Sequence, residues 1–108
     1  MEVRVALDTD RLTDLLRGDR ALAERLAECE EVWVPLIILA EMAKPTVAVP
    51  LPDRETAEQY ARLFVQLKRA GTPIPDNDLW IAALTLQHDL LLITHDRHFA
   101  CIPQLLRE

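Results

Sequence analysis

Four carboxylates in this chain lie next to apolar segments that are typical of strands and buried helices. Asp8 directly follows an apolar run at residues 3–7, and Asp96 follows the run LLLIT by two residues. Glu41 lies inside the stretch LIILAEM, and Asp78 directly precedes LWIAAL. Because the apolar context favours partial burial of Glu41 and Asp78, the four acids are candidates for one shared site.

Such a site has a definite chemistry. Two carboxylates about 4 Å apart repel each other by about 4 kcal/mol at an effective dielectric constant of 20, so several in one pocket need a compensating charge. Oxygen ligands without cysteine suit Mg²⁺ or Mn²⁺ better than zinc. An acidic magnesium site in turn suits chemistry on phosphates, and phosphodiester hydrolysis is the leading hypothesis.

The elements that must position these acids alternate between strands and helices. We expect a three-layer α/β sandwich with a mainly parallel sheet of about four strands and helices on both faces. In such sheets, ligands bind outside the carboxyl ends of the strands, where Asp8 and Asp96 are expected. The expected strands are residues 3–7, 32–34, 46–49 and 90–94, and the expected helices are two short ones before residue 28, then 35–42, 53–70 and 77–88.

The longest expected helix has clear signals at both ends. Asp53 is a suitable N-terminal cap, and Gly71 is a natural stop. Its pattern predicts one apolar face, made of Ala57, Tyr60, Ala61, Phe64 and Leu67.

Composition excludes several classes of protein. With only Gly18 and Gly71, the chain cannot spell a glycine-rich nucleotide-binding loop. A formal charge of −6 argues against binding nucleic acid by bulk attraction. Cys29 and Cys101 have no metal-type spacing and are expected to be reduced thiols, and no apolar run reaches the length of a membrane span. We therefore expect a soluble, cytoplasmic chain.

Four blocks carry a family resemblance. LDTDRLTDLLRGD, VPLIILAEM, IPDNDLWIAA and ITHDRHF resemble, in order, the blocks of a PIN-domain ribonuclease, most closely the VapC-type toxins of bacterial toxin–antitoxin pairs. The resemblance implies that Asp8, Glu41, Asp78 and Asp96 form an acidic quartet that binds Mg²⁺ or Mn²⁺ and activates water for RNA cleavage. It also implies a cognate antitoxin, whose basic segment enters the acidic site, and a homodimer.

Two features depart from that family. The chain has Asp10 where the family usually has asparagine or serine, which alters the local charge. The family also generally has about twenty further residues after the helix that bears the glutamate. We expect a single domain over residues 1–108 with a helical segment missing near residues 42–45. Either the protein lacks this segment or the sequence joins the two sides of a missing loop, and the intact flanking blocks favour the second interpretation.

Other polar residues near the acids have simpler explanations. Asp76 is expected to cap the helix that follows it, and Thr9 and Thr94 can support the acids by hydrogen bonding. His95 and His98 flank Asp96, but two imidazoles make a weak zinc site, and both are expected to be solvated. Scattered cations are expected on solvated faces or in ion pairs such as Glu58 with Arg62; those that could guide RNA are Arg11, Arg17, Lys68, Arg69 and Arg97.

Two alternatives stay open at this point. The sequence VALDTD has the spacing of a haloacid-dehalogenase-like phosphatase, with Asp8 as nucleophile and Asp10 as acid and base. The chain could instead be a non-catalytic module that binds a partner. A trapped phosphoaspartate would favour the phosphatase, metal-dependent RNA cleavage the nuclease, and neither activity the binding module.

Overall fold

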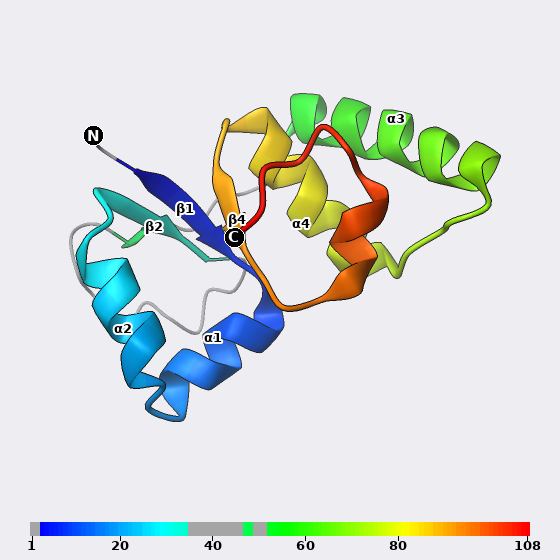
Figure 1. Cartoon of the computed structure of the whole chain (residues 1–108). Coiled ribbons are helices and arrows are strands. Elements are labelled where there is room, and N and C mark those ends of the chain that lie inside the picture. The colour runs from blue at the N-terminus through cyan, green and yellow to red at the C-terminus, as the bar shows by residue number, and fades with distance from the viewer. Residues whose placement is uncertain (1–2, 35–46, 49–51) are drawn as a thin grey trace.

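The computed structural model of the chain describes residues 3–34, 47–48 and 52–108 (Figure 1). Within these residues a four-stranded parallel sheet has the order β3-β2-β1-β4. At its centre, Val5 pairs with Val32 on one side and with Leu91 on the other. The expected sheet is thus confirmed, and its strands are β1 (Arg4–Leu7), β2 (Glu31–Trp33), β3 (Val47–Ala48) and β4 (Leu91–Ile93).

Helices cover both faces of this sheet, as expected. Ala6 and Leu92 point to one face and pack with Leu63 and Phe99, whereas Val5 lies in a second cluster on the other face. Figure 1 shows α1 and α2 on one side of the strands and α3 and α4 on the other. The helices are α1 (Thr9–Leu16), α2 (Arg20–Ala27), α3 (Arg54–Ala70), α4 (Asp76–Gln87) and the 3₁₀ helix η2 (Arg97–Cys101).

The break between α1 and α2 follows from two residues. Gly18 has a φ of 93°, which an L side chain rarely adopts, so α1 cannot continue through it. Asp19 then caps α2 by accepting a hydrogen bond from Leu22 N at 3.0 Å. The predicted pair of short helices is confirmed.

The ends of α3 are as predicted, and its predicted apolar face is buried in part, since Leu67 is in the core and Tyr60 packs against it. Asp53 and Thr56 form a reciprocal capping box, and Gly71 ends the helix with a φ of 74°. The helix buries Leu63 and Leu67 against α4, whereas Phe64 is 46% exposed. Ala57 and Ala61, also expected in the core, are exposed as well.

The other three positions were misassigned because α4 packs on a stripe that begins with the buried Thr56, which the apolar pattern did not count. A related expectation is also wrong, since Glu58 pairs with Arg54 at 3.4 Å rather than with Arg62. Neither error affects the ends of the helix, and Arg54, Glu58 and Arg62 lie on one face because they are four residues apart.

Residues 107–108, for which the sequence pattern predicts no element, lie beside β4 and bond to it. Arg107 forms a parallel bridge with Leu92, and Glu108 N donates to Leu92 O at 2.8 Å. Thr94 N in turn donates to Glu108 O at 3.2 Å. Residues 107–108 therefore hold the segment that leads from β4 to Asp96.

Some expectations lie outside the described residues. They are the helix at 35–42, which contains Glu41, and the missing segment near 42–45. Among the helices that the structure describes, none has the length and apolar composition needed to cross a membrane.

Candidate acidic active site

Asp8 is held in place as β1 ends and α1 begins. Its side chain caps α1, because Oδ1 accepts a hydrogen bond from Arg11 N at 2.8 Å. Its other oxygen, Oδ2, accepts a hydrogen bond from the hydroxyl of Thr94. The residue is 2% exposed, and each of its carboxylate oxygens accepts a hydrogen bond from within the protein.

Burial raises the pKa of Asp8 above its ordinary value. The hydrogen bonds from Thr94 and Arg11 act in the opposite direction, whereas the negative charges of Asp10 and Asp96 raise the pKa further. Asp10 itself lies exposed in the first turn of α1. The electrostatic environment of Asp8 is therefore one in which an added cation would be stabilising.

Thr94 connects Asp8 to the segment after β4. Its hydroxyl oxygen accepts a hydrogen bond from Asp96 N at 2.9 Å while the same hydroxyl donates to Asp8. Asp96 then caps η2, since its Oδ1 accepts from His98 N at 2.9 Å. The expectation that Thr94 supports the acids by hydrogen bonding is confirmed.

Asp78, at the start of α4, meets Asp96 at the side chain of His98. The Nδ1 atom of His98 lies 2.8 Å from Oδ2 of Asp78 and 3.2 Å from Oδ1 of Asp96. One ligand atom from each of these three residues lies within 4.8 Å of the others. Within the described residues, this is a group of side chains able to hold a metal ion.

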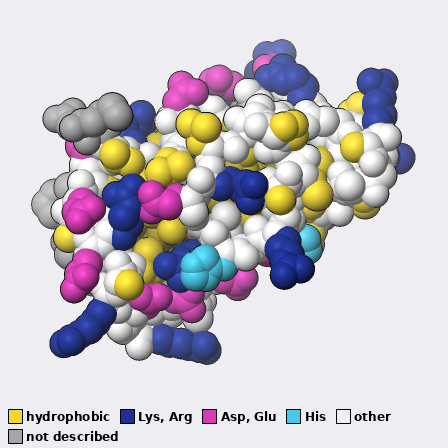
Figure 2. All heavy atoms as spheres, viewed as in Figure 1, with side chains coloured by type: hydrophobic (Ala, Val, Ile, Leu, Met, Phe, Trp, Pro, Cys, Tyr) yellow, Lys and Arg dark blue, Asp and Glu magenta, His cyan; other side chains and the backbone are white. Residues whose placement is uncertain are grey.

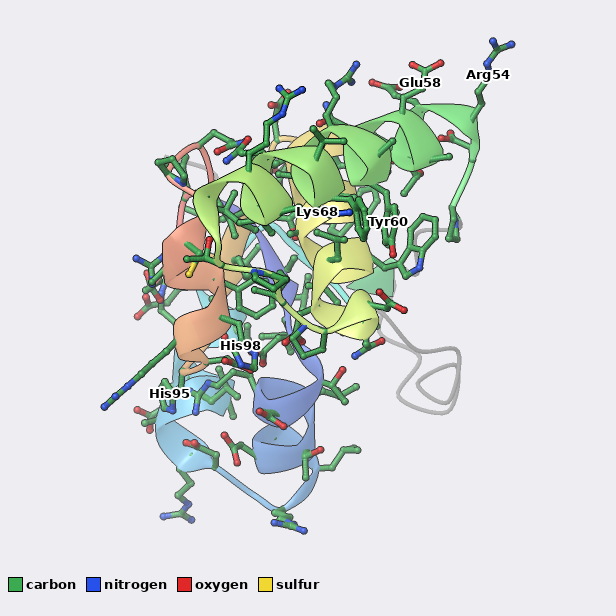
Figure 3. All side chains as sticks on the ribbon, turned by 90° about the vertical axis from the view of Figure 1, so that its right-hand side faces the viewer. Arg54, Glu58, Tyr60, Lys68, His95 and His98 are labelled. Carbon is green, nitrogen blue, oxygen red and sulfur yellow. The ribbon has the colours of Figure 1, made fainter. Side chains whose placement is uncertain are left out.

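His98 is exposed, as expected, but its contacts with Asp78 and Asp96 were not predicted. Its side chain is 49% exposed, but the hydrogen bond to Asp78 and the charge of Asp96 raise its pKa. The signal was present in the sequence, because a histidine two residues after Asp96 can fold back on it once Asp96 caps a helical turn. Figure 3 shows His98 beside the start of α1, with His95 near it.

His95 has different surroundings. It is exposed, and its Nδ1 lies 3.5 Å from Nη1 of Arg11. The guanidinium of Arg11 also donates to Asp14 at 3.0 Å and to Asp19 at 3.5 Å. Within the described residues, the two histidines therefore do not form a zinc site together.

Figure 2 shows acidic side chains gathered next to a histidine over α1.

Arg11 was expected on a solvated face or in an ion pair, and the structure shows the second: it is 8% exposed and pairs with Asp14 and Asp19. Its three contacts tie α1 to the start of α2 and to the loop after β4. The leucine periodicity around it could not reveal this, because the acids that bind it come from the next turn and the next helix.

Two smaller expectations concern the start of α4. Asp76 does not cap it, since Pro75 occupies the cap position and Asp76 is the first helical residue. Asp76 instead accepts a hydrogen bond from the Tyr60 hydroxyl at 3.1 Å. Asn77 donates to the hydroxyl of Thr9 at 3.3 Å, which joins the starts of α1 and α4.

The chain was compared with protein-family models, with characterised proteins and with solved structures. No family model matches it. Ribonuclease VapC1 of Haemophilus influenzae strain R2866 is 29% identical over 104 residues, which cover 89% of this chain and 78% of that protein. Ribonuclease VapC5 of Mycobacterium tuberculosis is 34% identical over 101 residues, which cover 94% of this chain and 62% of that protein.

The structural comparison covers more of both chains. The structure of VapBC-1 from nontypeable Haemophilus influenzae matches with a TM-score of 0.78 and 25% identity, over 98% of this chain and 97% of that one. The chain is thus similar in sequence to ribonucleases named VapC and similar in fold to a VapBC structure. The resemblance carried by the four sequence blocks is thus confirmed.

The donor set at this site fits a hard divalent cation. Carboxylate oxygens of Asp78 and Asp96 converge from two elements, and such oxygens are the ligands that Mg²⁺ and Mn²⁺ take in proteins. Asp8 joins them through Thr94. Glu41, the remaining acid of the expected quartet, lies outside the described residues.

Proposed function

We propose that the chain is a metal-dependent endoribonuclease and the toxin of a toxin–antitoxin pair. The observation that carries the proposal is the meeting of Asp78 and Asp96 at one cation-sized site, with Asp8 joined to it through Thr94, in a VapC-type PIN domain. The similarity to proteins named Ribonuclease VapC supports RNA as the substrate.

In this proposal Asp8, Asp78 and Asp96, with Glu41, hold Mg²⁺ or Mn²⁺. A bound divalent cation supplies a water of lowered pKa and neutralises charge on the phosphate that is attacked. Thr94 orients Asp8 and the backbone at Asp96, so the two acids keep a fixed separation. Asp8 and Asp96 follow neighbouring parallel strands, which supports a reaction at the carboxyl edge of the sheet.

The phosphatase alternative requires Asp8 to attack phosphorus directly. Both oxygens of Asp8 already accept hydrogen bonds, and the residue is 2% exposed, which opposes that role. Asp10, its proposed acid and base, is exposed on α1. The geometry therefore favours metal-dependent hydrolysis without a covalent intermediate.

The proposed partners follow from the comparisons and from charge. The solved structures that match include a toxin–antitoxin complex from Klebsiella pneumoniae, with 26% identity and a TM-score of 0.71. A chain with a formal charge of −6 and an acidic site would attract a basic segment of an antitoxin. We also propose a homodimer, which sedimentation of the purified protein would test.

The decisive experiment is cleavage of a structured RNA by the purified protein with Mg²⁺, with Mn²⁺ or with EDTA. Asp96→Asn should abolish cleavage while its amide oxygen still caps η2. Asp89→Asn is a matched control, because Asp89 lies after α4 with a φ of 53° that asparagine adopts readily. Cleavage that persists in EDTA would overturn the metal mechanism, and full activity of Asp96→Asn would overturn the site. Phosphate trapped on Asp8 would favour the phosphatase instead.

The missing helical segment near residues 42–45 is also a proposal. Mass spectrometry of the intact protein tests it directly. A mass equal to the 12.3 kDa of the present sequence would show that the protein itself lacks the segment.

A further inference from the structure

His98 occupies the place where Asp78 and Asp96 come together. It reaches Asp78 from η2, 20 residues further along the chain, and its Nδ1 is within 3.2 Å of an oxygen of each acid. Two features fix the imidazole there. The backbone N–H of His98 is bound by Asp96, and the next side chain, Phe99, is 0% exposed and anchors η2 in the core.

The distances from His98 Nδ1 to the two carboxylate oxygens suit a cation bound by all three side chains, whose donor atoms lie within 4.8 Å of one another. Ligands at right angles around a cation with bonds of about 2.1 Å lie about 3.0 Å from each other. The separations of 2.8 Å and 3.2 Å between His98 Nδ1 and the two carboxylate oxygens are close to this value. A cation can therefore replace the direct contacts with little movement of any of the three side chains.

We propose that His98 is a protein ligand of the cation, and that its nitrogen makes the site favour Mn²⁺ over Mg²⁺. This inference rests on the proposed metal-dependent function and identifies the ion. Mg²⁺ takes oxygen ligands in near-ideal octahedral geometry. Mn²⁺ shares the preference for carboxylate oxygens, but it is a first-row transition ion and belongs to the series that also binds nitrogen ligands. Two carboxylates and one imidazole thus form a mixed set that Mn²⁺ accepts more readily than Mg²⁺.

A different role for His98 makes the opposite prediction. If its imidazole serves only as a positive counter-ion for Asp78 and Asp96, an incoming cation must displace it. Removing His98 would then strengthen the binding of Mg²⁺ and Mn²⁺ equally and leave their ratio unchanged. The ratio of the two dissociation constants therefore separates a ligand from a counter-ion.

Calorimetric titration of the metal-free protein with Mg²⁺ alone and with Mn²⁺ alone measures that ratio. In His98→Asn an amide oxygen lies close to the position of Nδ1, so an oxygen donor replaces a nitrogen donor. We expect the preference for Mn²⁺ to fall by about tenfold or more, since even the loss of outer partners costs metal sites 10- to 100-fold. The matched control is His95→Asn, which changes a histidine that contacts Arg11.

Electron spin-echo spectroscopy of the Mn²⁺-loaded protein gives a second readout, and its main result comes from the wild type. Coupling to a directly bound imidazole nitrogen should be present in the wild type and in His95→Asn, and absent from His98→Asn. Absence of nitrogen coupling in the wild type, or an unchanged ratio in His98→Asn, would overturn the inference alone. Failure of the wild type to bind either ion would instead overturn the proposed function.

Discussion

The hydroxyl of Thr94 donates a hydrogen bond to Oδ2 of Asp8, although the two residues are 86 positions apart in the sequence. The same oxygen accepts from Asp96 N at 2.9 Å. One buried hydroxyl thus fixes the acid at the end of β1 relative to the acid that follows β4. The precision of the proposed metal site depends on this contact.

Replacing Thr94 with valine keeps the shape of the side chain and removes both hydrogen bonds. We expect Thr94→Val to weaken metal binding and RNA cleavage by roughly 10- to 100-fold, the usual cost of losing a partner of a ligand. Thr94→Ser should retain most of both. The control is Thr85→Val, since Thr85 is equally buried but bonds to Ile81 O in α4. Equal metal affinity in Thr94→Val and Thr85→Val would contradict the prediction.

Asp8 and Asp78 differ in how the fold compensates their charge. Asp8 is 2% exposed and accepts its side-chain hydrogen bonds from neutral groups, whereas Asp78 contacts His98 at 2.8 Å. In EDTA, Asp8→Asn should therefore stabilise the protein by about 0.5–2 kcal/mol, as relief of functional strain does. Asp78→Asn should change stability less, because it also removes the contact with His98.

Calorimetry in EDTA measures this difference, since each kcal/mol shifts the Tm of a domain near this size by roughly 4–8 °C. Mg²⁺ at about 100 times its Kd should stabilise the wild type by about 2.7 kcal/mol. Both variants should lose much of that increment. A larger gain for Asp78→Asn than for Asp8→Asn would show that His98 does not compensate Asp78.

Gly71 ends α3 in the left-handed region, with a φ of 74°. A Cβ there would meet nothing within 4 Å, so an added methyl group costs conformational strain and no steric clash. Gly71→Ala should destabilise the protein by roughly 1–2 kcal/mol. Gly71→Asn should cost less, because asparagine tolerates this conformation. Chemical denaturation compares the two variants, and equal losses would point to a cause other than backbone conformation.

Glu108 gives a pH dependence that is separate from the acidic site. Two hydrogen bonds from Arg25, at 2.7 and 2.8 Å, lower the pKa of Glu108 below its ordinary value of 4.5. A carboxyl with a lowered pKa contributes stability that is present above its unfolded pKa and is lost as the pH falls through its folded pKa. Glu108→Gln should therefore have a lower Tm than the wild type at neutral pH.

The difference in Tm between Glu108→Gln and the wild type should close in acid, below the folded pKa of Glu108. Arg25→Gln should show the same pattern, because it removes the other half of the pair. A difference that is constant from neutral to acid pH would mean that the charge of Glu108 contributes nothing.

Most of the architecture could be predicted because it follows from short-range patterns. Apolar runs marked β1 and β4, and Gly18 and Gly71 marked helix ends through their backbone conformations. Asp8 and Asp96 could be assigned to one site because parallel strands deliver their carboxyl ends to one edge, whereas Asp78 was assigned from its apolar context and from the family resemblance.

What could not be predicted depends on contacts between distant elements. The buried face of α3 is set by where α4 packs, and Leu63 rather than Phe64 lies in the core. The contact of His98 with Asp78 joins η2 to α4 and has no local signature beyond the spacing of Asp96 and His98. The periodicity of apolar residues cannot predict contacts that form only when distant elements pack together.

The position of β1 between β2 and β4 has a consequence for synthesis on the ribosome. Asp8 emerges with the first strand, and β1 can pair with β2 early. Asp96 and His98 are synthesised after β4, and they reach Asp8 and Asp78 when β4 fills the other side of β1. The proposed site can therefore assemble only after β1, β2 and α4 have been made, so its acids come together late in folding during synthesis.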